Sequence, residues 1–195
     1  MKINSINSQF NFGKTAVATC QVIKKGKKEA LPATLYKMDP SNWGDQKEVF
    51  FSKNTGCIKY AFDLEAEKQT YGKGREFYLL KADSNQEVIA CAQTLHKFRA
   101  GDVQHQGLTT MVEEINENKK FKNGALPLFA YIAHRANDRH DKSVISVTCT
   151  DELPKLQKKL KLTETKTNGV FALSKRRFDN FINRAKKENQ LEIIG

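Results

Sequence analysis

The sequence predicts a single domain of mixed α/β class, in which a mostly antiparallel central sheet contains one βαβ unit. The chain has 195 residues, of which 39% are hydrophobic and 9% aromatic, and this composition suits one globular core. Segments of strand character joined by short polar turns alternate with apolar segments of helical spacing. With only four prolines and no repeat or low-complexity tract, no linker divides residues 1–195.

The N-terminal residues 1–40 are predicted to form a β-hairpin extension. Thr15 to Ile23 is rich in β-forming residues, KKGKKE makes a basic turn, and Leu31 to Met38 returns as the second strand. Two helices are expected next. Ser41 opens a short one, and Cys57 to Tyr71 carries apolar residues at helical spacing.

Three consecutive strands and a βαβ unit are predicted in the middle of the chain. REFYLLKAD and EVIACAQTLHKF are joined by the polar turn SNQ, which is typical of an antiparallel hairpin. A third strand covers Leu108 to Ile115, an apolar helix runs from about Gly124 to Ala136, and Ser143 to Cys149 forms a strand expected to be buried on both faces. The strand, loop, helix and strand have room for a right-handed crossover.

The C-terminal part is predicted to contain two helices and a hairpin. A helix over Glu152 to Leu160 leads into LTETK and GVFALSK, which are predicted to form a terminal hairpin. Residues 174–195 then form a basic helix, capped by Ser174 and ending near Asn189, followed by LEII as an edge strand.

Charge and cysteine content restrict the class of partner and compartment. Lys and Arg outnumber Asp and Glu by 33 to 22, a net charge of +11, which favours an anionic partner such as a phosphate cofactor, nucleic acid or a membrane surface. The four cysteines are far apart, so we expect reduced thiols in a cytoplasmic protein. The N-terminus lacks a signal peptide core, and no apolar run approaches the ~20 residues that span a bilayer, so no membrane partner is expected. His134 and His140 have no metal-helix pattern, so no structural metal is expected.

The stretch KKFKNGALPLFAYIAHR places a basic loop before an apolar helix. The first turn of a helix presents free backbone N–H groups at the positive end of its dipole, which favours a bound anion. Asn123, Gly124 and Ala125 allow a close backbone approach, and the neighbouring lysines add positive charge. The alternative is a solvated basic loop capped by Asn123.

This loop and its surroundings resemble the GNAT superfamily of acyl-CoA-dependent N-acyltransferases. In that family an apolar residue ends the fourth strand, and the motif Arg/Gln-x-x-Gly-x-Gly/Ala follows and grips the CoA pyrophosphate. Ile115 matches the strand end, while Lys120 stands for Arg/Gln, Asn123 for the first Gly and Ala125 for the last position. The resemblance implies acetyl-CoA as co-substrate and a loop of cofactor contacts: Ile115, Lys120, Phe121, Lys122, Asn123, Gly124 and Ala125.

The segment TDELPKLQKKLKL resembles the family pattern Asn-x-x-Ala-x-x-Leu-Tyr-x-Lys-Leu-Gly-Phe. Thr150 takes the place of Asn, so it and Gln157 join the predicted cofactor contacts. The Tyr that often protonates the departing CoA thiolate is replaced by Gln157, and an amide cannot supply a proton at neutral pH. Either solvent protonates the thiolate, another residue does so, or the protein binds CoA without acyl transfer.

Two residues are candidates for the general base that deprotonates the amine. Counting back in twos along the strand from Ile115 places Glu113 rather than Glu114 toward the cleft, and a strand bulge there would reverse the choice. His96, at a strand end, is the second candidate, because its ordinary pKa of about 6.5 suits proton transfer. A solvated carboxylate and a partly exposed histidine are the alternatives.

The sequence therefore predicts an N-acetyltransferase that acts on an amine whose identity it does not encode. The alternatives are a CoA-binding protein without catalysis, a nucleic-acid-binding protein, and an acetyltransferase of an anionic macromolecule such as charged tRNA. The basic stretches KKGKK, KLQKKLK and SKRRFDNFINRAKK would attract nucleic acid if they converged on one face. They lack interleaved aromatic residues, so nucleic acid is not favoured. A homodimer is compatible with the sequence.

Overall fold

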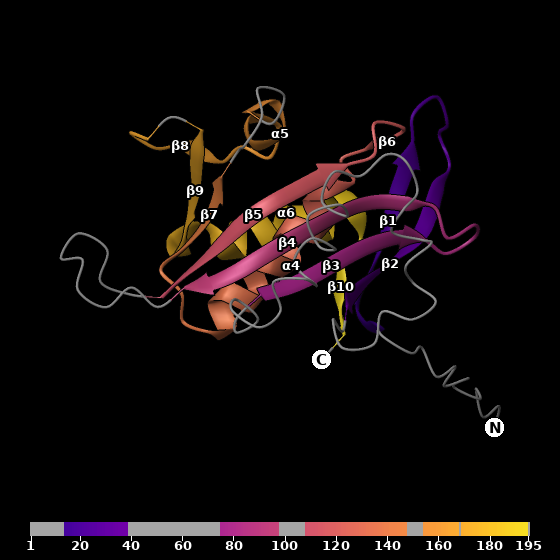
Figure 1. Ribbon diagram of the computed structural model, residues 1–195. Coiled ribbons are helices and arrows are strands. Elements are labelled where there is room, and N and C mark those ends of the chain that lie inside the picture. Colours follow the sequence, from indigo (N-terminus) through magenta and orange to yellow (C-terminus); the bar gives the residue numbers. More distant parts are fainter. Residues whose placement is uncertain (1–13, 39–74, 98–107, 148–153, 168, 195) are drawn as a thin grey trace, which may run out of the picture.

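The computed structural model describes residues 14–38, 75–97, 108–147, 154–167 and 169–194 (Figure 1). The two helices predicted after the N-terminal hairpin lie outside these residues. Among the described helices, none has the length and apolar character needed to cross a bilayer.

One sheet organises the described part of the chain, and its strands run in the order β10-β1-β2-β3-β4-β5-β7-β9-β8, with β6 paired to β1. Neighbouring strands are antiparallel except for β5 and β7, which are parallel. The predicted mixed α/β class with a mostly antiparallel sheet is confirmed. The strands are β1 (Lys14–Lys24), β2 (Ala30–Met38), β3 (Arg75–Ala82), β4 (Val88–Lys97), β5 (Thr109–Glu117), β6 (Phe121–Lys122), β7 (Ser143–Val147), β8 (Thr163–Glu164), β9 (Val170–Ser174) and β10 (Glu192–Ile193).

The predicted N-terminal hairpin is present and continues the central sheet. Strand β1 pairs with β2 from Lys14↔Met38 to Ile23↔Ala30, and β2 in turn pairs with β3. Strand β1 also pairs with β6, through Ile23↔Lys122 and Lys24↔Phe121. Residues of the hairpin therefore lie beside the loop that enters the central helix, although almost 100 positions separate them in the sequence.

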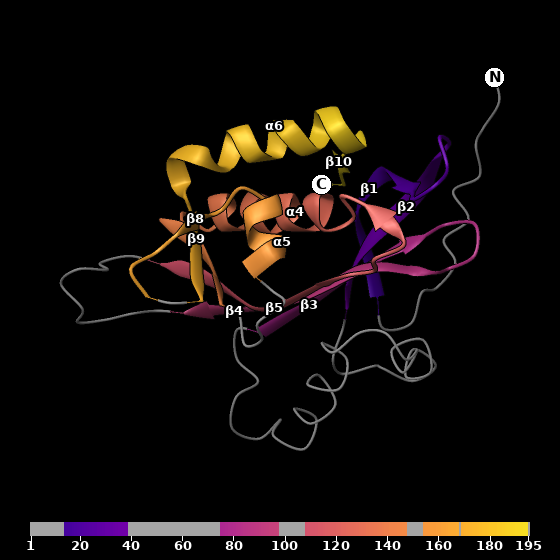
Figure 2. The ribbon, with the colours of Figure 1, turned by 90° about the horizontal axis from the view of Figure 1, so that it is seen from above.

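Helix α4 (Ala125–Asp138) covers one face of the sheet and completes the predicted βαβ unit with β5 and β7. Its apolar residues are buried almost around the whole helix, because the sheet lies on one side and helix α6 (Phe178–Asn189) on the other (Figure 2). The prediction for β7 is wrong in one respect. Val144 and Ser146 are buried, whereas Ser143 and Ile145 on the opposite face remain partly exposed, so only one face is fully covered.

Helix α6 forms a third layer above α4. Its buried residues repeat at helical spacing, and the rings of Phe181 and Phe129 lie 5.4 Å apart between centroids. A 3-10 turn, Lys175–Arg177, precedes α6, and Ser174 makes no side-chain capping hydrogen bond, so its predicted capping role is wrong. The helix ends at Asn189, as predicted, and β10 then pairs with β1 through Ala18↔Ile193.

Candidate anion and cofactor site

The parallel pair β5 and β7 separates part of the way along its length. Pairing extends from Thr109↔Ser143 to Val112↔Ser146, while β5 continues to Glu117. The backbone of β5 beyond Val112 is therefore not paired with β7, and helix α5 (Pro154–Lys159) lies near this end of β5. This opening leads to the N-terminus of α4.

A cavity of about 450 Å³ lies at this opening, and most of its lining side chains are cationic. Four lysines face one carboxylate, so the local charge is strongly positive. This distribution suits a ligand with several negative charges. The lining residues are Lys25, Asn116, Glu117, Lys119, Lys155, Leu156 and Lys159.

The four lysines come from three segments of the chain. Lys25 belongs to the turn of the N-terminal hairpin, and its backbone N–H donates to the Lys120 carbonyl at 2.7 Å. Lys119 belongs to the loop before α4, whereas Lys155 and Lys159 extend from α5. The pairing of β6 with β1 explains how the hairpin turn reaches the cavity.

The loop before α4 has the backbone that its residue types predict. Asn123 has φ of 51°, a left-handed conformation that Asn accepts more readily than most residues. Gly124 has an ordinary helical φ of −64°, and a Cβ there would lie 2.6 Å from Ile89 Cγ2. Asn123 thus serves the backbone turn, while Gly124 is required for close packing against β4.

Backbone N–H groups of this loop remain available for an anion. The N–H groups of Asn123 and Gly124 donate to no backbone carbonyl in the turns, loops and caps of the described residues. The N–H of Ala125, the first residue of α4, donates to Glu117 Oε1 at 3.1 Å. The predicted anion loop therefore has two open donors and a third that an internal carboxylate occupies.

The other predicted contacts of the loop differ in position. Ile115 and Phe121 are each 1% exposed and belong to the core, so they support the loop from the core side. Lys120 and Lys122 are exposed, and Lys120 Nζ lies 3.4 Å from Glu87 Oε1. The two buried residues can therefore only support the loop, whereas the two exposed lysines can reach a ligand.

Glu113 lies at a bulge in β5 next to the point where β5 and β7 separate. The register with β4 shifts between Gln93↔Glu114 and Thr94↔Val112, which leaves Glu113 as the extra residue. Glu113 Oε2 accepts a hydrogen bond from Gln93 Nε2 at 2.9 Å. Because β4 residues alternate, Gln93 and with it Glu113 lie on the face opposite α4. The bulge therefore reverses the alternation counted back from Ile115, which belongs to the core beneath α4, so Glu113 does not share the face of Ile115 as predicted.

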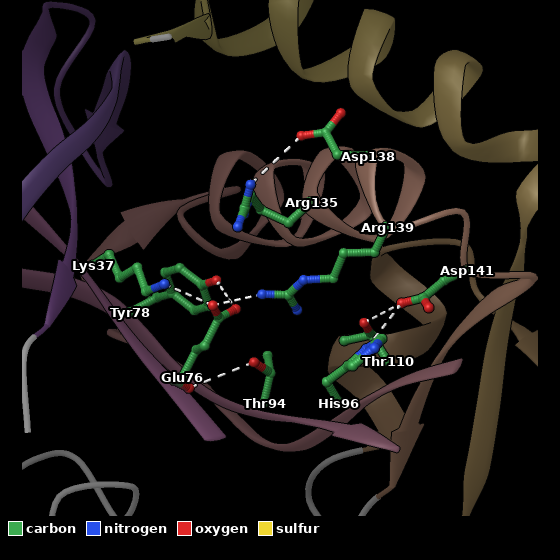
Figure 3. Close-up of polar contacts among 10 residues, drawn as sticks. All are labelled: Lys37, Glu76, Tyr78, Thr94, His96, Thr110, Arg135, Asp138, Arg139 and Asp141. Atoms are coloured by element: carbon green, nitrogen blue, oxygen red, sulfur yellow. Dashed lines mark hydrogen bonds and ion pairs between the residues drawn. The ribbon is translucent and has the colours of Figure 1, made fainter. Parts of the chain in front are cut away.

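His96 lies at the other end of β5. It pairs with Thr110, and its Nδ1 is 3.6 Å from Asp141 Oδ2 (Figure 3). Thr110 also donates to that carboxylate oxygen, at 2.5 Å. Asn116, which lines the cavity, is six strand positions further along, or roughly 20 Å at about 3.3 Å per residue. The structure therefore does not bring His96 to the cavity.

Gln157 and Ser146 meet where the β5–β7 pairing ends. Both side chains are fully buried, and Gln157 Nε2 donates to Ser146 Oγ at 3.0 Å. Gln157 Oε1 has no hydrogen-bond partner within the described part of the chain. Thr150, the other predicted contact in this region, lies outside the described residues.

A second polar cluster anchors the C-terminal end of α4 to the sheet (Figure 3). Arg139 Nη2 and Lys37 Nζ each lie 2.6 Å from Glu76 Oε1, and the Tyr78 hydroxyl donates to Glu76 Oε2 at 2.6 Å. Burial alone would raise the pKa of Glu76, but the hydrogen bonds from Lys37 and Tyr78 and the charge of Arg139 lower it to about 2. This cluster lies away from the cavity and has a structural role.

Sequence reasoning missed Glu117 and Ser146. Glu117 follows Ile115 by two positions, so strand alternation places both on the α4 side of the sheet. That signal was available in the sequence. Within the described ranges, no three side chains of the types His, Cys, Asp and Glu come together as a metal site.

The fold matches solved structures over most of the chain. AtaT in complex with acetyl-methionyl-tRNAfMet superposes with a TM-score of 0.55, covering 76% of this chain and 98% of that one at 8% identity. The chain has the GNAT fold. AtaTR bound with acetyl-CoA gives a TM-score of 0.55 at 7% identity, covering 76% of this chain and 96% of that chain.

The apo form of FdhC, a nucleotide-linked sugar GNAT, gives a TM-score of 0.52 at 12% identity, covering 79% and 93% of the two chains. The resemblance to the GNAT superfamily is thereby confirmed at the level of fold. No family model matches the sequence, and no curated protein matches it either.

Proposed function

We propose that this GNAT-fold protein is an N-acetyltransferase that transfers the acetyl group of acetyl-CoA to an amine. The observation that carries the proposal is the cavity beside the loop before α4, which is lined by four lysines and by Glu117, whose carboxylate accepts from the first N–H of α4. CoA carries several phosphate charges, and such a donor set fits phosphates. In support, AtaTR of the same fold has been solved with acetyl-CoA.

The roles of individual residues follow from their places around the cavity. In this proposal the phosphates are held by the amides of the adjacent loop and by the four lysines that line the cavity, Lys25, Lys119, Lys155 and Lys159. Acetyl-CoA supplies a thioester carbonyl for attack, and a primary amine must be deprotonated before or during that attack. Glu113, beside the opening of the strands, is the proposed base.

The departing thiolate takes its proton from solvent in this proposal. Gln157 cannot act as an acid at neutral pH, and its amide already donates to Ser146. A thiolate is a sufficiently good leaving group to depart without an acid from the protein.

Thermal unfolding with and without acetyl-CoA tests the cofactor, because a ligand that binds only the folded state raises its stability by mass action. We expect a clear rise in Tm with acetyl-CoA. The paired change Lys155→Gln and Lys159→Gln should reduce it, and Lys166→Gln, an exposed lysine outside the cavity, should not. No rise at millimolar acetyl-CoA would contradict the proposal.

The same protein preparation tests the base. With a panel of primary amines, release of free CoA should be measurable and should fall by roughly 10²-fold or more in Glu113→Gln. The acetyl-CoA shift in Tm should persist in that variant, because Glu113 lies on the face opposite α4 and is absent from the cavity lining. Unchanged turnover in Glu113→Gln would remove Glu113 from the mechanism.

A second candidate function is acetylation of an anionic macromolecule such as charged tRNA. One observation favours it: the basic stretches KKGKK and KLQKKLK, which are distant in sequence, both contribute lysines to the cavity. Lys27, Lys28 and Lys158 of the same two stretches are also exposed. AtaT, with the same fold, has been solved with acetyl-methionyl-tRNAfMet. Binding of bulk tRNA at physiological salt separates the two functions.

A further inference from the structure

The carboxylate of Glu117 bridges two of the cationic groups of the proposed phosphate site. Its Oε1 accepts from the Ala125 N–H at 3.1 Å, and its Oε2 lies 2.8 Å from Lys159 Nζ. The Glu117 side chain is only 13% exposed. Glu117 pairs with Ala90 at the last position of β5, which directs its carboxylate at the first turn of α4.

These contacts are of the kind that a phosphate makes. A helix N-terminus attracts negative charge through its open N–H groups and its dipole, and a lysine ammonium pairs with phosphate as it pairs with a carboxylate. Glu117 therefore occupies one backbone donor and one ammonium that a phosphate could otherwise bind. A Cβ at Gly124 would lie 3.5 Å from Glu117 Oε1, so the loop before α4 passes beside this carboxylate.

We infer that Glu117 is an internal competitor that lowers the affinity of this site for phosphate groups. A phosphate that enters the cavity either displaces the Glu117 carboxylate from Ala125 and Lys159 or binds beside a like charge. Both cost free energy that the lysines must offset. The inference rests on the proposed function in one respect: it takes the phosphates of CoA as the natural occupant.

The competing explanation gives Glu117 a structural role alone. A carboxylate at a helix N-terminus stabilises the helix, and ligand phosphates could then use only the remaining donors without disturbing it. Replacement by Gln separates the two explanations. The amide oxygen still accepts from the Ala125 N–H, whereas the negative charge is removed and Lys159 is released.

The experiment is calorimetric titration of the full chain with CoA and, separately, with inorganic pyrophosphate. We expect Glu117→Gln to bind both roughly tenfold more tightly than the unchanged protein, because a like charge within a few Å of the phosphates is lost. Glu192→Gln is the matched control. It makes the same change in net charge at an exposed residue of β10, and its affinities should not change.

A double-mutant cycle with Lys159 gives an independent readout. If Glu117 occupies Lys159, then Lys159→Gln should cost little affinity in the unchanged protein and more in the Glu117→Gln background. The two changes are in contact, so non-additivity is the expected sign of coupling. A cycle that closes additively would overturn the inference, as would equal or weaker binding by Glu117→Gln. Urea unfolding of each variant establishes that it is folded.

The two anions separate failure of the inference from failure of the proposed function. Tighter pyrophosphate binding by Glu117→Gln, with no CoA binding by either protein, would support the internal competitor and reject CoA as the ligand. CoA binding of equal strength in both proteins would reject the competitor and leave the proposed function standing. Absence of binding to both anions in both proteins would reject both.

Discussion

Glu76 shows how strongly one residue can depend on its partners. Its carboxylate contacts Lys37, Tyr78 and Arg139, which hold its pKa at about 2 instead of the usual 4.5 although burial acts in the opposite direction. A carboxyl group with a lowered pKa in the folded state stabilises the protein above the unfolded-state pKa. That contribution is lost as the pH falls from about 4.5 toward 2.

We predict that Glu76→Gln lowers the free energy of unfolding by about 2–3 kcal/mol at pH 7. The difference from the unchanged protein should shrink as the pH falls through the window from about 4.5 to 2. Urea unfolding at a series of pH values measures it. The exposed Glu164 provides the control, since Glu164→Gln should have little effect at any pH. A difference for Glu76→Gln that stayed constant down to pH 2 would show that the lost contacts are not electrostatic.

At the residue scale, the sequence predicted the backbone of the loop before α4 better than the positions of the candidate catalytic groups. The residue types of Asn123 and Gly124 indicate a tight turn, and the turn is there. The bulge at Glu113 was foreseen only as an option, because a bulge depends on the register between two strands. The Glu117 contact with Lys159 joins residues 42 positions apart, and no local pattern reports such a contact.

At the scale of elements, α6 provides the outer cover of α4. The apolar stripe of α6 contains Phe178, Phe181, Ile182 and Ala185, and Phe181 is 5% exposed against Phe129. Without α6, the apolar residues on the outer side of α4 would face water. The helix is therefore part of the core and not an appendage.

We predict that Phe181→Ala lowers the free energy of unfolding by about 3–5 kcal/mol, because it removes a large buried ring and leaves a cavity. Chemical denaturation followed by circular dichroism measures this. Asn183→Ala, on the exposed side of the same helix, should change stability by no more than about 0.5 kcal/mol. Similar small effects of both changes would mean that α6 does not contribute to the core.

The longer elements were predictable because each contains several repeats of its own period. The hairpin strands, α4 and α6 are examples, and their ends fall within a few residues of the predicted positions. The two-residue strand β6 was not predictable, since two residues carry no periodicity. Its partner, β1, lies in the most distant segment of the described chain.

At the scale of the whole molecule, the net charge of +11 is concentrated in part around one cavity. The third basic stretch does not contribute to the cavity lining. It lies on α6, which packs its apolar side on α4 and leaves Lys186 and Lys187 exposed in the outer layer. Two of the three basic stretches therefore converge. Affinity for nucleic acid distinguishes a site for small phosphate ligands from a nucleic-acid surface.

We predict that bulk tRNA binds weakly and without specificity at physiological salt. Filter binding across a salt series, with and without acetyl-CoA, measures this. Affinity should fall steeply with salt, with a log–log slope of roughly −0.7 to −0.9 for each phosphate neutralised. Submicromolar binding at physiological salt would favour the macromolecular acceptor. Competition by acetyl-CoA would further show that RNA reaches the same lysines.

The pairing of β6 with β1 has a consequence for the rate of ligand capture. Because the loop before α4 is held by Ile23↔Lys122 and Lys24↔Phe121, and by the Lys25 N–H on the Lys120 carbonyl, its backbone is ordered before any ligand arrives. The entropic cost of ordering the loop on binding is therefore small. The surrounding lysines also attract anions from a distance. Association should therefore be fast and should slow as salt is added, so differences among phosphate ligands should appear mainly in how long each one stays bound.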